Sequence, residues 1–267
     1  MAENNCTARL NRLRKNLSVR FSISAVQQEE GRYCLTDIIN CLDSNLQETV
    51  KELGRQLITE SSSIRFGYFH DKTGENFKFK YDVPFISKKH DIAILELIED
   101  PSKVFPDSVE LVSLNAPKTL IHILGHPGGR ELQTDPGCKI IYDEHELEKT
   151  IKESVKFFST LFVNIPIDES DFSKCKISAE QILFHCSKST AHGASGSPLI
   201  QNENDQPEVI GMLLEGYPKI FYNELCNNIE ANKRPDLLIE SGISMEKVKS
   251  LLFEHRLSEL SKSIFTR

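Results

Sequence analysis

Polar and hydrophobic residues alternate over many short stretches of the chain, and this period of two predicts a mainly β protein. Turn-forming residues separate the stretches. The clearest examples are residues 19–24, 32–36, 64–70 and 209–216. No apolar run approaches the length of a membrane-spanning helix, so we expect no contact with a membrane.

Three other stretches show helical spacing of their apolar residues. Residues 44–57 begin with a capping box, Ser44 to Gln47, and predict a helix inserted after the first strands. Residues 143–160 are rich in charge and predict a surface helix. From Met245 onward the apolar positions predict a C-terminal helix.

The segment Gly-Ala-Ser-Gly-Ser-Pro at residues 193–198 stands directly before the apolar pair Leu199-Ile200. A serine between glycines in this pattern is typical of the nucleophile loop of chymotrypsin-like serine peptidases. Ser195 would supply the attacking hydroxyl, and the backbone N–H groups of Gly193 and Ser195 would form the oxyanion hole. The alternative is a turn of small residues between two strands.

A second segment supplies a candidate acid. Asp91 stands directly before a strand-like run, Ile92 to Leu97, and 104 residues before Ser195. In the same class of peptidase an aspartate at a strand entrance orients the catalytic histidine. The order and the separation fit an acid on a first barrel and a nucleophile on a second. Taken alone, Asp91 has the alternative role of a cap at the start of a strand.

A third segment, residues 119–129, reads as a strand that ends in a Gly-His-Pro-Gly-Gly turn. Together the three motifs resemble the peptidase domain of the family-with-sequence-similarity-111 serine proteases, over about residues 17–253 and best over 91–215. The resemblance implies a trypsin-like serine peptidase domain, and it also implies a nuclear, replication-linked setting and self-cleavage. His126 follows the aspartate in the chain, and we interpret it as a structural turn residue.

The expected fold is therefore mainly β, with two antiparallel six-stranded barrels, an inserted helix after the first strands and a C-terminal helix. A polar, basic lead-in occupies residues 1–16, and the peptidase domain occupies residues 17–267. Within it we expect the first barrel at about 17–115, the second at about 116–240 and the C-terminal helix at about 245–265.

The general base of a catalytic triad is missing from its expected place. In this fold the histidine follows a strand that ends in Leu-Thr, and here Ile39 stands at that position. No histidine precedes His70 in the chain. An aliphatic side chain cannot accept the serine proton. Neither His70, nor His90 beside the aspartate, nor His192 beside the nucleophile is suitably placed to replace it.

The same fold also implies a substrate pocket. Its wall would be Leu214, Glu215 and Gly216, and its base would be Ser189, whose uncharged side chain favours large apolar or aromatic P1 residues. Ala194 stands where trypsin-like zymogens have an aspartate, so activation by cleavage at a new N-terminus is not expected.

Composition limits the remaining classes of function. The 267 residues, 39% of them hydrophobic, suffice for one two-lobed domain. The seven cysteines form no C-x-x-C pair, and no apolar signal segment begins the chain, so we expect reduced thiols in an intracellular protein of the cytoplasm or nucleus. Nothing resembles a metal cluster or a phosphate loop, so no metal and no cofactor are expected. The net charge of −7 argues against nucleic acid binding by this domain, although its first 20 residues are locally basic.

These observations predict a trypsin-like peptidase fold that has kept the nucleophile Ser195 and the acid Asp91 but has Ile39 at the base position. Such a pseudopeptidase would bind peptides or act as an interaction module. Two alternatives stay open: an active intracellular serine endopeptidase with an unlocated histidine, and another β-rich binding domain with a fortuitous serine loop. In the first two cases the expected partner is a polypeptide, and the oligomeric state is open.

Overall fold

The structure is a computed structural model, and it describes eleven segments of the chain. Contacts within the chain divide it into two compact units, one over Val19–Pro106 and one that includes Asp107–Arg267. We call them the N-terminal unit and the C-terminal unit and describe each by itself. The described segments are residues 63–66, 75–80, 83–87, 89–104, 112–114, 120–127, 132–162, 165–186, 194–203, 206–222 and 234–265.

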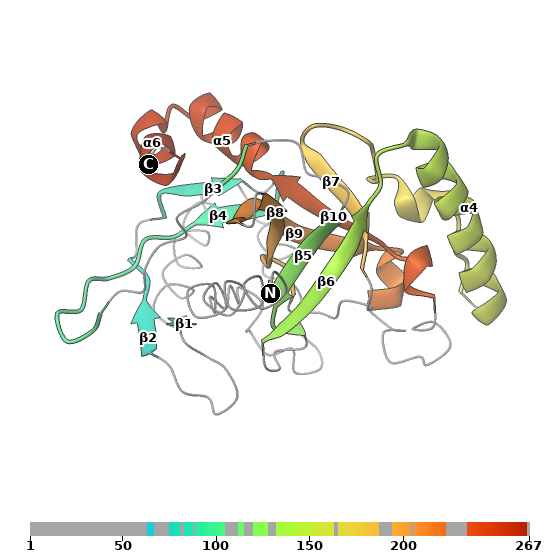
Figure 1. Cartoon of the computed structure of the whole chain (residues 1–267), viewed down its shortest axis with the longest axis horizontal. Helices are drawn as coiled ribbons and strands as arrows, with labels where there is room; N and C mark the ends of the chain where they lie inside the picture. Colours follow the sequence, from blue (N-terminus) through green and yellow to red (C-terminus); the bar gives the residue numbers. More distant parts are fainter. Residues whose placement is uncertain are drawn as a thin grey trace, which may run out of the picture. The chain divides into compact units, whose positions relative to one another are not determined.

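Six antiparallel strands of the C-terminal unit close into a barrel (Figure 1). The strands are β5 (Leu120–Gly125), β6 (Gln133–Ile140), β7 (Gln181–His185), β8 (Pro198–Glu203), β9 (Gln206–Tyr217) and β10 (Ile239–Ser244). Around the barrel the order is β5-β6-β7-β10-β9-β8, and β8 closes the ring by pairing with β5. Two three-stranded meanders, β5 to β7 and β8 to β10, therefore meet along two seams.

This barrel matches the expected second barrel of about residues 116–240, except that its last strand extends to Ser244. Alternation along the strands sets which side chains point inward. On β5, Ile121 and Ile123 are buried while Leu120 is exposed. The inward residues form one apolar core: Ile121, Ile123, Cys138, Ile140, Ile182, Phe184, Cys186, Ala194, Leu199, Ile210 and Leu213.

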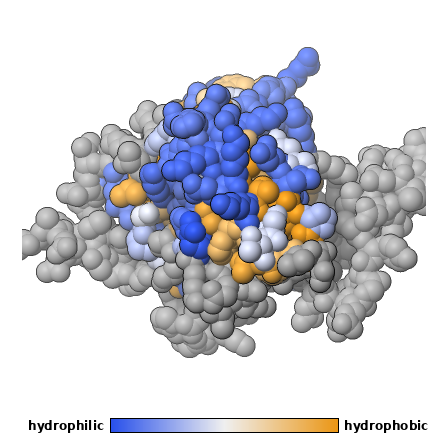
Figure 2. Space-filling model, turned by 90° about the vertical axis from the view of Figure 1, so that its right-hand side faces the viewer, coloured by the Kyte–Doolittle hydropathy of each residue, from blue (hydrophilic) through white to orange (hydrophobic). Residues whose placement is uncertain are grey.

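The surface helix expected over residues 143–160 is confirmed as α4 (Glu144–Leu161). Asp143 caps its start, because the carboxylate accepts a 2.9 Å hydrogen bond from the backbone N–H of Glu146. One face of α4 is buried against two short 3₁₀ helices, η2 (Glu169–Phe172) and η5 (Pro235–Leu237). Figure 2 views the molecule from the side on which α4 lies in Figure 1. Hydrophilic side chains cover much of the described surface there, and a hydrophobic area lies below them.

The single helix expected at about 245–265 is instead two helices, α5 (Met245–Glu254) and α6 (Ser258–Phe265). The chain turns between them at Arg256, whose φ of 60° lies in the left-handed region. No glycine or proline marks this break in the sequence. Periodicity alone therefore could not reveal it, because α6 continues the amphipathic pattern.

The described part of the N-terminal unit contains two antiparallel two-stranded sheets. One pairs β1 (Ser63–Phe66) with β2 (Glu75–Lys78), and the other pairs β3 (Phe85–Ser87) with β4 (Ile92–Ile94). Most of the expected first barrel lies outside the described residues, so this barrel stays a prediction. The lead-in at 1–16, the helix at 44–57 and the strands at 19–24 and 32–36 also lie outside them.

Among the described helices, none combines the length and the apolar character that crossing a membrane requires.

The register of β5 can be tested with two neighbouring alanine substitutions. Ile121 has 0% of its surface exposed and Leu120 has 53%. We expect Ile121→Ala to lower the free energy of unfolding by about 2–5 kcal/mol, because it opens a cavity in the barrel core. Leu120→Ala should change it by no more than about 0.5 kcal/mol. Urea unfolding followed by circular dichroism measures both, since the chain has no tryptophan to report by fluorescence. Equal costs would contradict the register.

Candidate functional site

Ser195 lies exposed on a turn directly before β8, between two buried residues, Ala194 and Ser197. Three backbone hydrogen bonds hold this turn. The N–H of Gly196 donates to the carbonyl of Leu213 at 2.7 Å, and the N–H of Leu213 donates to the carbonyl of Ser197 at 2.9 Å. The N–H of Ser197 donates to the carbonyl of Ala194 at 3.0 Å. The serine hydroxyl is thus presented to solvent by a turn that is fixed to β9.

Two glycines explain the composition of this site. Gly196 has a φ of 85°, a left-handed conformation that a side chain would strain. Gly125, at the end of β5, lies against the same turn, because a Cβ atom added there would stand 2.2 Å from the Ser197 Oγ. The Gly-His-Pro turn and the serine loop, far apart in the sequence, therefore meet in the fold. His126 is buried beside them in the chain, which fits a structural role.

The expected pocket wall, Leu214 to Gly216, lies on β9 and is half-buried. The Glu215 carboxylate accepts a 2.6 Å hydrogen bond from the Tyr217 hydroxyl and pairs with Lys219 at 2.8 Å and Lys174 at 3.4 Å. Burial pushes the pKa of Glu215 up, but the hydrogen bonds from Lys219 and Tyr217 outweigh it, so this pKa lies below its usual value. Burial and the Glu215 carboxylate raise the pKa of Tyr217. Glu215 is thus a charged, paired group at the edge of the site.

Gly216 is covered by a side chain that the sequence analysis did not identify. The ring of Tyr222 lies where a Cβ atom of Gly216 would stand, with its Cζ only 2.2 Å from that position. The Tyr222 hydroxyl donates a hydrogen bond to the carboxylate of Glu240. Glu240 is 2% exposed and lies opposite Gly216 in the register of β9 and β10. One sequence signal did exist, since Glu240 is a charged residue within an otherwise apolar and small-residue run.

Five of the residues considered for the site lie outside the described residues: Gly193, Ser189, His192, His70 and Ile39. The oxyanion hole, the pocket base and the identity of the base position therefore stay predictions.

Asp91 belongs to the N-terminal unit, where it is exposed and directly precedes β4 with a φ of 53°. Its neighbour His90 shares a 2.9 Å hydrogen bond between its Nδ1 and the Ser87 hydroxyl. The role of Asp91 as the acid of the site stays a prediction.

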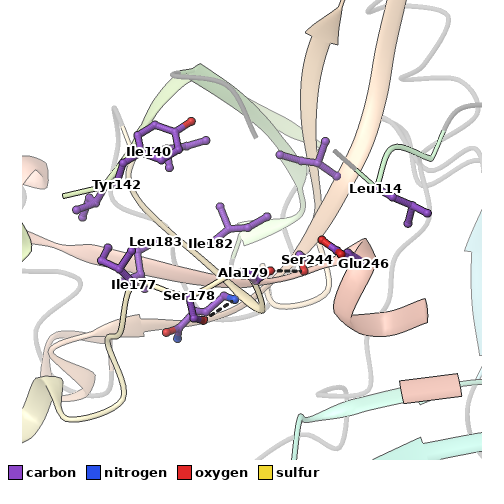
Figure 3. Close-up of a pocket in the computed structure, with 13 residues that line it drawn as sticks. Leu114, Ile140, Tyr142, Ile177, Ser178, Ala179, Ile182, Leu183, Ser244 and Glu246 are labelled. Carbon is purple, nitrogen blue, oxygen red and sulfur yellow. Dashed lines mark hydrogen bonds between the residues drawn. The ribbon is translucent and has the colours of Figure 1, made fainter. Parts of the chain in front are cut away.

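The C-terminal unit also has an apolar cavity of about 150 Å³, separate from the serine turn (Figure 3). Isoleucines and leucines of β6, β7 and the segment before β7 line it, and Ser244 and Glu246 contribute its polar rim. Two hydrogen bonds hold the rim: Ser244 Oγ donates to the carbonyl of Ala179 at 3.0 Å, and the N–H of Gln181 donates to Ser178 Oγ at 3.2 Å. Its described lining includes neither Ser195 nor the expected pocket wall.

The described site therefore consists of an exposed serine on a fixed turn at the rim of a closed antiparallel barrel. No protein-family model matches the chain, and no curated protein matches its sequence. Among solved structures, Rv3671c from M. tuberculosis H37Rv, a serine-to-alanine mutant in its inactive form, is similar over 72% of this chain and 68% of that chain. The sequence identity is 16% and the TM-score is 0.38. At these values the similarity carries no conclusion about function.

A double-mutant cycle tests whether Tyr222 covers Gly216. We expect Gly216→Ala to lower the free energy of unfolding by about 1–3 kcal/mol, because the new methyl group must displace the tyrosine ring. In a Tyr222→Ala background the same substitution should cost much less, which gives a coupling energy of about 0.5–3 kcal/mol. Urea unfolding of the four proteins measures the cycle. Additive costs would show that the ring does not occupy this space.

Proposed function

We propose that the chain is a chymotrypsin-like serine peptidase-fold protein that binds extended peptide segments and lacks the general base for catalysis. The observation that carries the proposal is the exposed Ser195 on a turn fixed to β9, at the start of β8 in a closed six-stranded barrel. The resemblance of the three sequence motifs to the family-with-sequence-similarity-111 proteases supports the same class. The expected second barrel of that class supports it as well.

The geometry of β9 supports peptide binding beside Ser195. β8 pairs with β9 only as far as Met212, while β10 pairs with it through Tyr217. Among the described strands, the edge of residues 214–216 that faces away from β10 has no strand partner. An extended peptide can add to such an edge as a further strand, with backbone hydrogen bonds that do not depend on its sequence.

Two features favour binding over catalysis. Ile39 stands at the expected base position, and its aliphatic side chain cannot take the proton from Ser195. The ring of Tyr222 already occupies the space at Gly216, so a substrate side chain would have to displace it there. Displacement would also remove the tyrosine hydroxyl from the buried Glu240 carboxylate, which is costly.

An active endopeptidase is the second candidate function, because the described serine turn has the form that a nucleophile requires. It would need a histidine from the part of the chain outside the described residues. In either case we propose a polypeptide partner and an intracellular location, in the cytoplasm or nucleus.

A labelling experiment separates the two candidates. Loss of the base lowers the rate of such a triad by about 10⁴- to 10⁶-fold. We therefore expect the unmodified chain to react with a fluorophosphonate probe, and to cleave peptides, no faster than Ser195→Ala. Ile39→His should increase labelling if Ile39 occupies the base position. Rapid Ser195-dependent labelling of the unmodified chain would establish the endopeptidase instead.

Peptide binding can be tested at the same position. Ser195→Ala should bind peptides from a random extended library as the unmodified chain does. Ser195→Trp should bind them at least about 10-fold more weakly, because a bulky side chain at this exposed position blocks the neighbouring strand edge. Fluorescence anisotropy with labelled peptides measures both variants. Equal binding by the two variants, or no binding by any of the proteins, would contradict the proposed site.

A further inference from the structure

Two cysteines from different parts of the sequence lie opposite each other in the barrel wall. β6 and β7 pair antiparallel, with Lys139 opposite His185 and Ile140 opposite Phe184. The same register, continued by one residue, places Cys138 opposite Cys186. Their thiols are buried, with exposed fractions of 0% and 6%. The two sulfur atoms and a carboxylate oxygen of Asp135 all lie within 4.8 Å of one another.

A bulge in β6 is what brings the carboxylate to the thiols. In a regular strand, residues three apart such as 135 and 138 point to opposite faces. Here Ile121 of β5 pairs with Cys138, but the next residue, His122, pairs with Pro136. Gly137 is the extra residue, and its φ of 88° is left-handed. The bulge thus shifts the alternation by one position, so that the side chains of residues 135 and 138 can share a side.

We propose that Asp135, Cys138 and Cys186 bind a divalent metal ion of the zinc class, through one carboxylate oxygen and two thiolates. Zn²⁺ and Co²⁺ prefer such mixed sulfur and oxygen ligands in a tetrahedral arrangement. Three protein ligands leave a fourth position for water. The sequence pattern predicts no metal site, because Cys186 stands 48 residues after Cys138 and the three residues follow no metal-binding spacing.

The protons balance in a simple exchange. Without a metal, cysteine thiols are mostly protonated at neutral pH. Binding of the ion releases one proton from each thiol, and the carboxylate joins without a proton. No oxidant is needed. A disulfide between the same cysteines would need an oxidant and would make no use of the carboxylate that the bulge brings in.

The metal would connect β6 to Cys186, the residue that follows β7. Cys138 and Cys186 belong to the same core as Ala194, the residue before Ser195. Cys186 and Ala194 are also the two ends of the segment that carries Ser189 and Gly193. A metal ion would therefore fix the entrance of that segment. The site does not depend on Ser195 acting as a nucleophile.

Cobalt titration of the reduced full chain tests the proposal. We expect a single Co²⁺ ion to bind with a thiolate-to-metal charge-transfer band and the visible bands of a tetrahedral site, and Zn²⁺ to displace it. Cys138→Ser and Cys186→Ser should each lose these bands. Cys175→Ser is the matched control, because Cys175 is also buried, 7% exposed, but lies outside the cluster. It should bind like the unmodified chain.

Asp135→Asn keeps both thiols and should bind at least about 10-fold more weakly. If a cysteine variant fails to fold, thermal unfolding of the other two proteins tests metal binding instead. Zn²⁺ should then raise the Tm of the unmodified chain more than that of Asp135→Asn. The proposal is overturned if the unmodified chain binds no stoichiometric metal, or if Cys175→Ser loses the bands as Cys138→Ser does. A thiol count that is two short until reductant is added would show a disulfide at Cys138 and Cys186, and would overturn it as well.

Discussion

The register of one strand, the twelve-residue β9, determines the geometry of the whole C-terminal unit. Its first half pairs with β8 and its second half with β10, and these two strands pair in turn with β5 and β7 of the other meander. The barrel therefore closes only if both registers of β9 hold together. Each pairing contains a bulge, which lets the strand bend around the barrel. A slip of one residue would turn every core side chain of β9 toward solvent. The serine turn, the open edge at 214–216 and the contact of Gly216 with Tyr222 all follow from this registration.

Buried polar groups set a second constraint, because each of them needs a partner. Glu240 is a carboxylate within β10, a strand whose six residues are all buried. Tyr222 supplies a hydroxyl to it and, in doing so, places its ring over Gly216. The ring thus fills the space beside Gly216, one residue of the expected pocket wall, because its hydroxyl satisfies a carboxylate. A peptide side chain that entered the space beside Gly216 would compete with water and with the hydrogen bond from Tyr222 to Glu240.

Local signals in the sequence were sufficient for the elements that depend on local chemistry. Asp143 and the helical spacing after it predicted α4 to within one residue at each end, and the strand at 209–216 lies within β9. β6 was not predicted, because Pro136 and Gly137 argue against a strand and instead form its bulge. The break at Arg256 has no local signal.

The candidate site likewise has one part that local sequence signals predict and another that they do not. The serine turn is a contiguous motif, and the sequence located it before the fold was known. The contacts of Gly216 with Tyr222 and of Cys138 with Cys186 join residues from different strands or loops. Such contacts depend on strand order and register, which the alternation of polar and apolar residues does not determine.

The serine motif itself has a structural explanation that is independent of catalysis. Ala194 is a small residue of the barrel core, Gly196 takes a left-handed φ, and Ser197 is buried where Gly125 approaches the turn. Each of these positions restricts its residue type through packing or backbone conformation. The exposed side chain of Ser195 is under no such restriction. These restrictions would persist in a chain with an aliphatic residue at the base position, because they come from packing in the barrel and not from catalysis. Packing and backbone conformation therefore account for residues 194, 196 and 197 of the motif, and they leave the residue type at position 195 open.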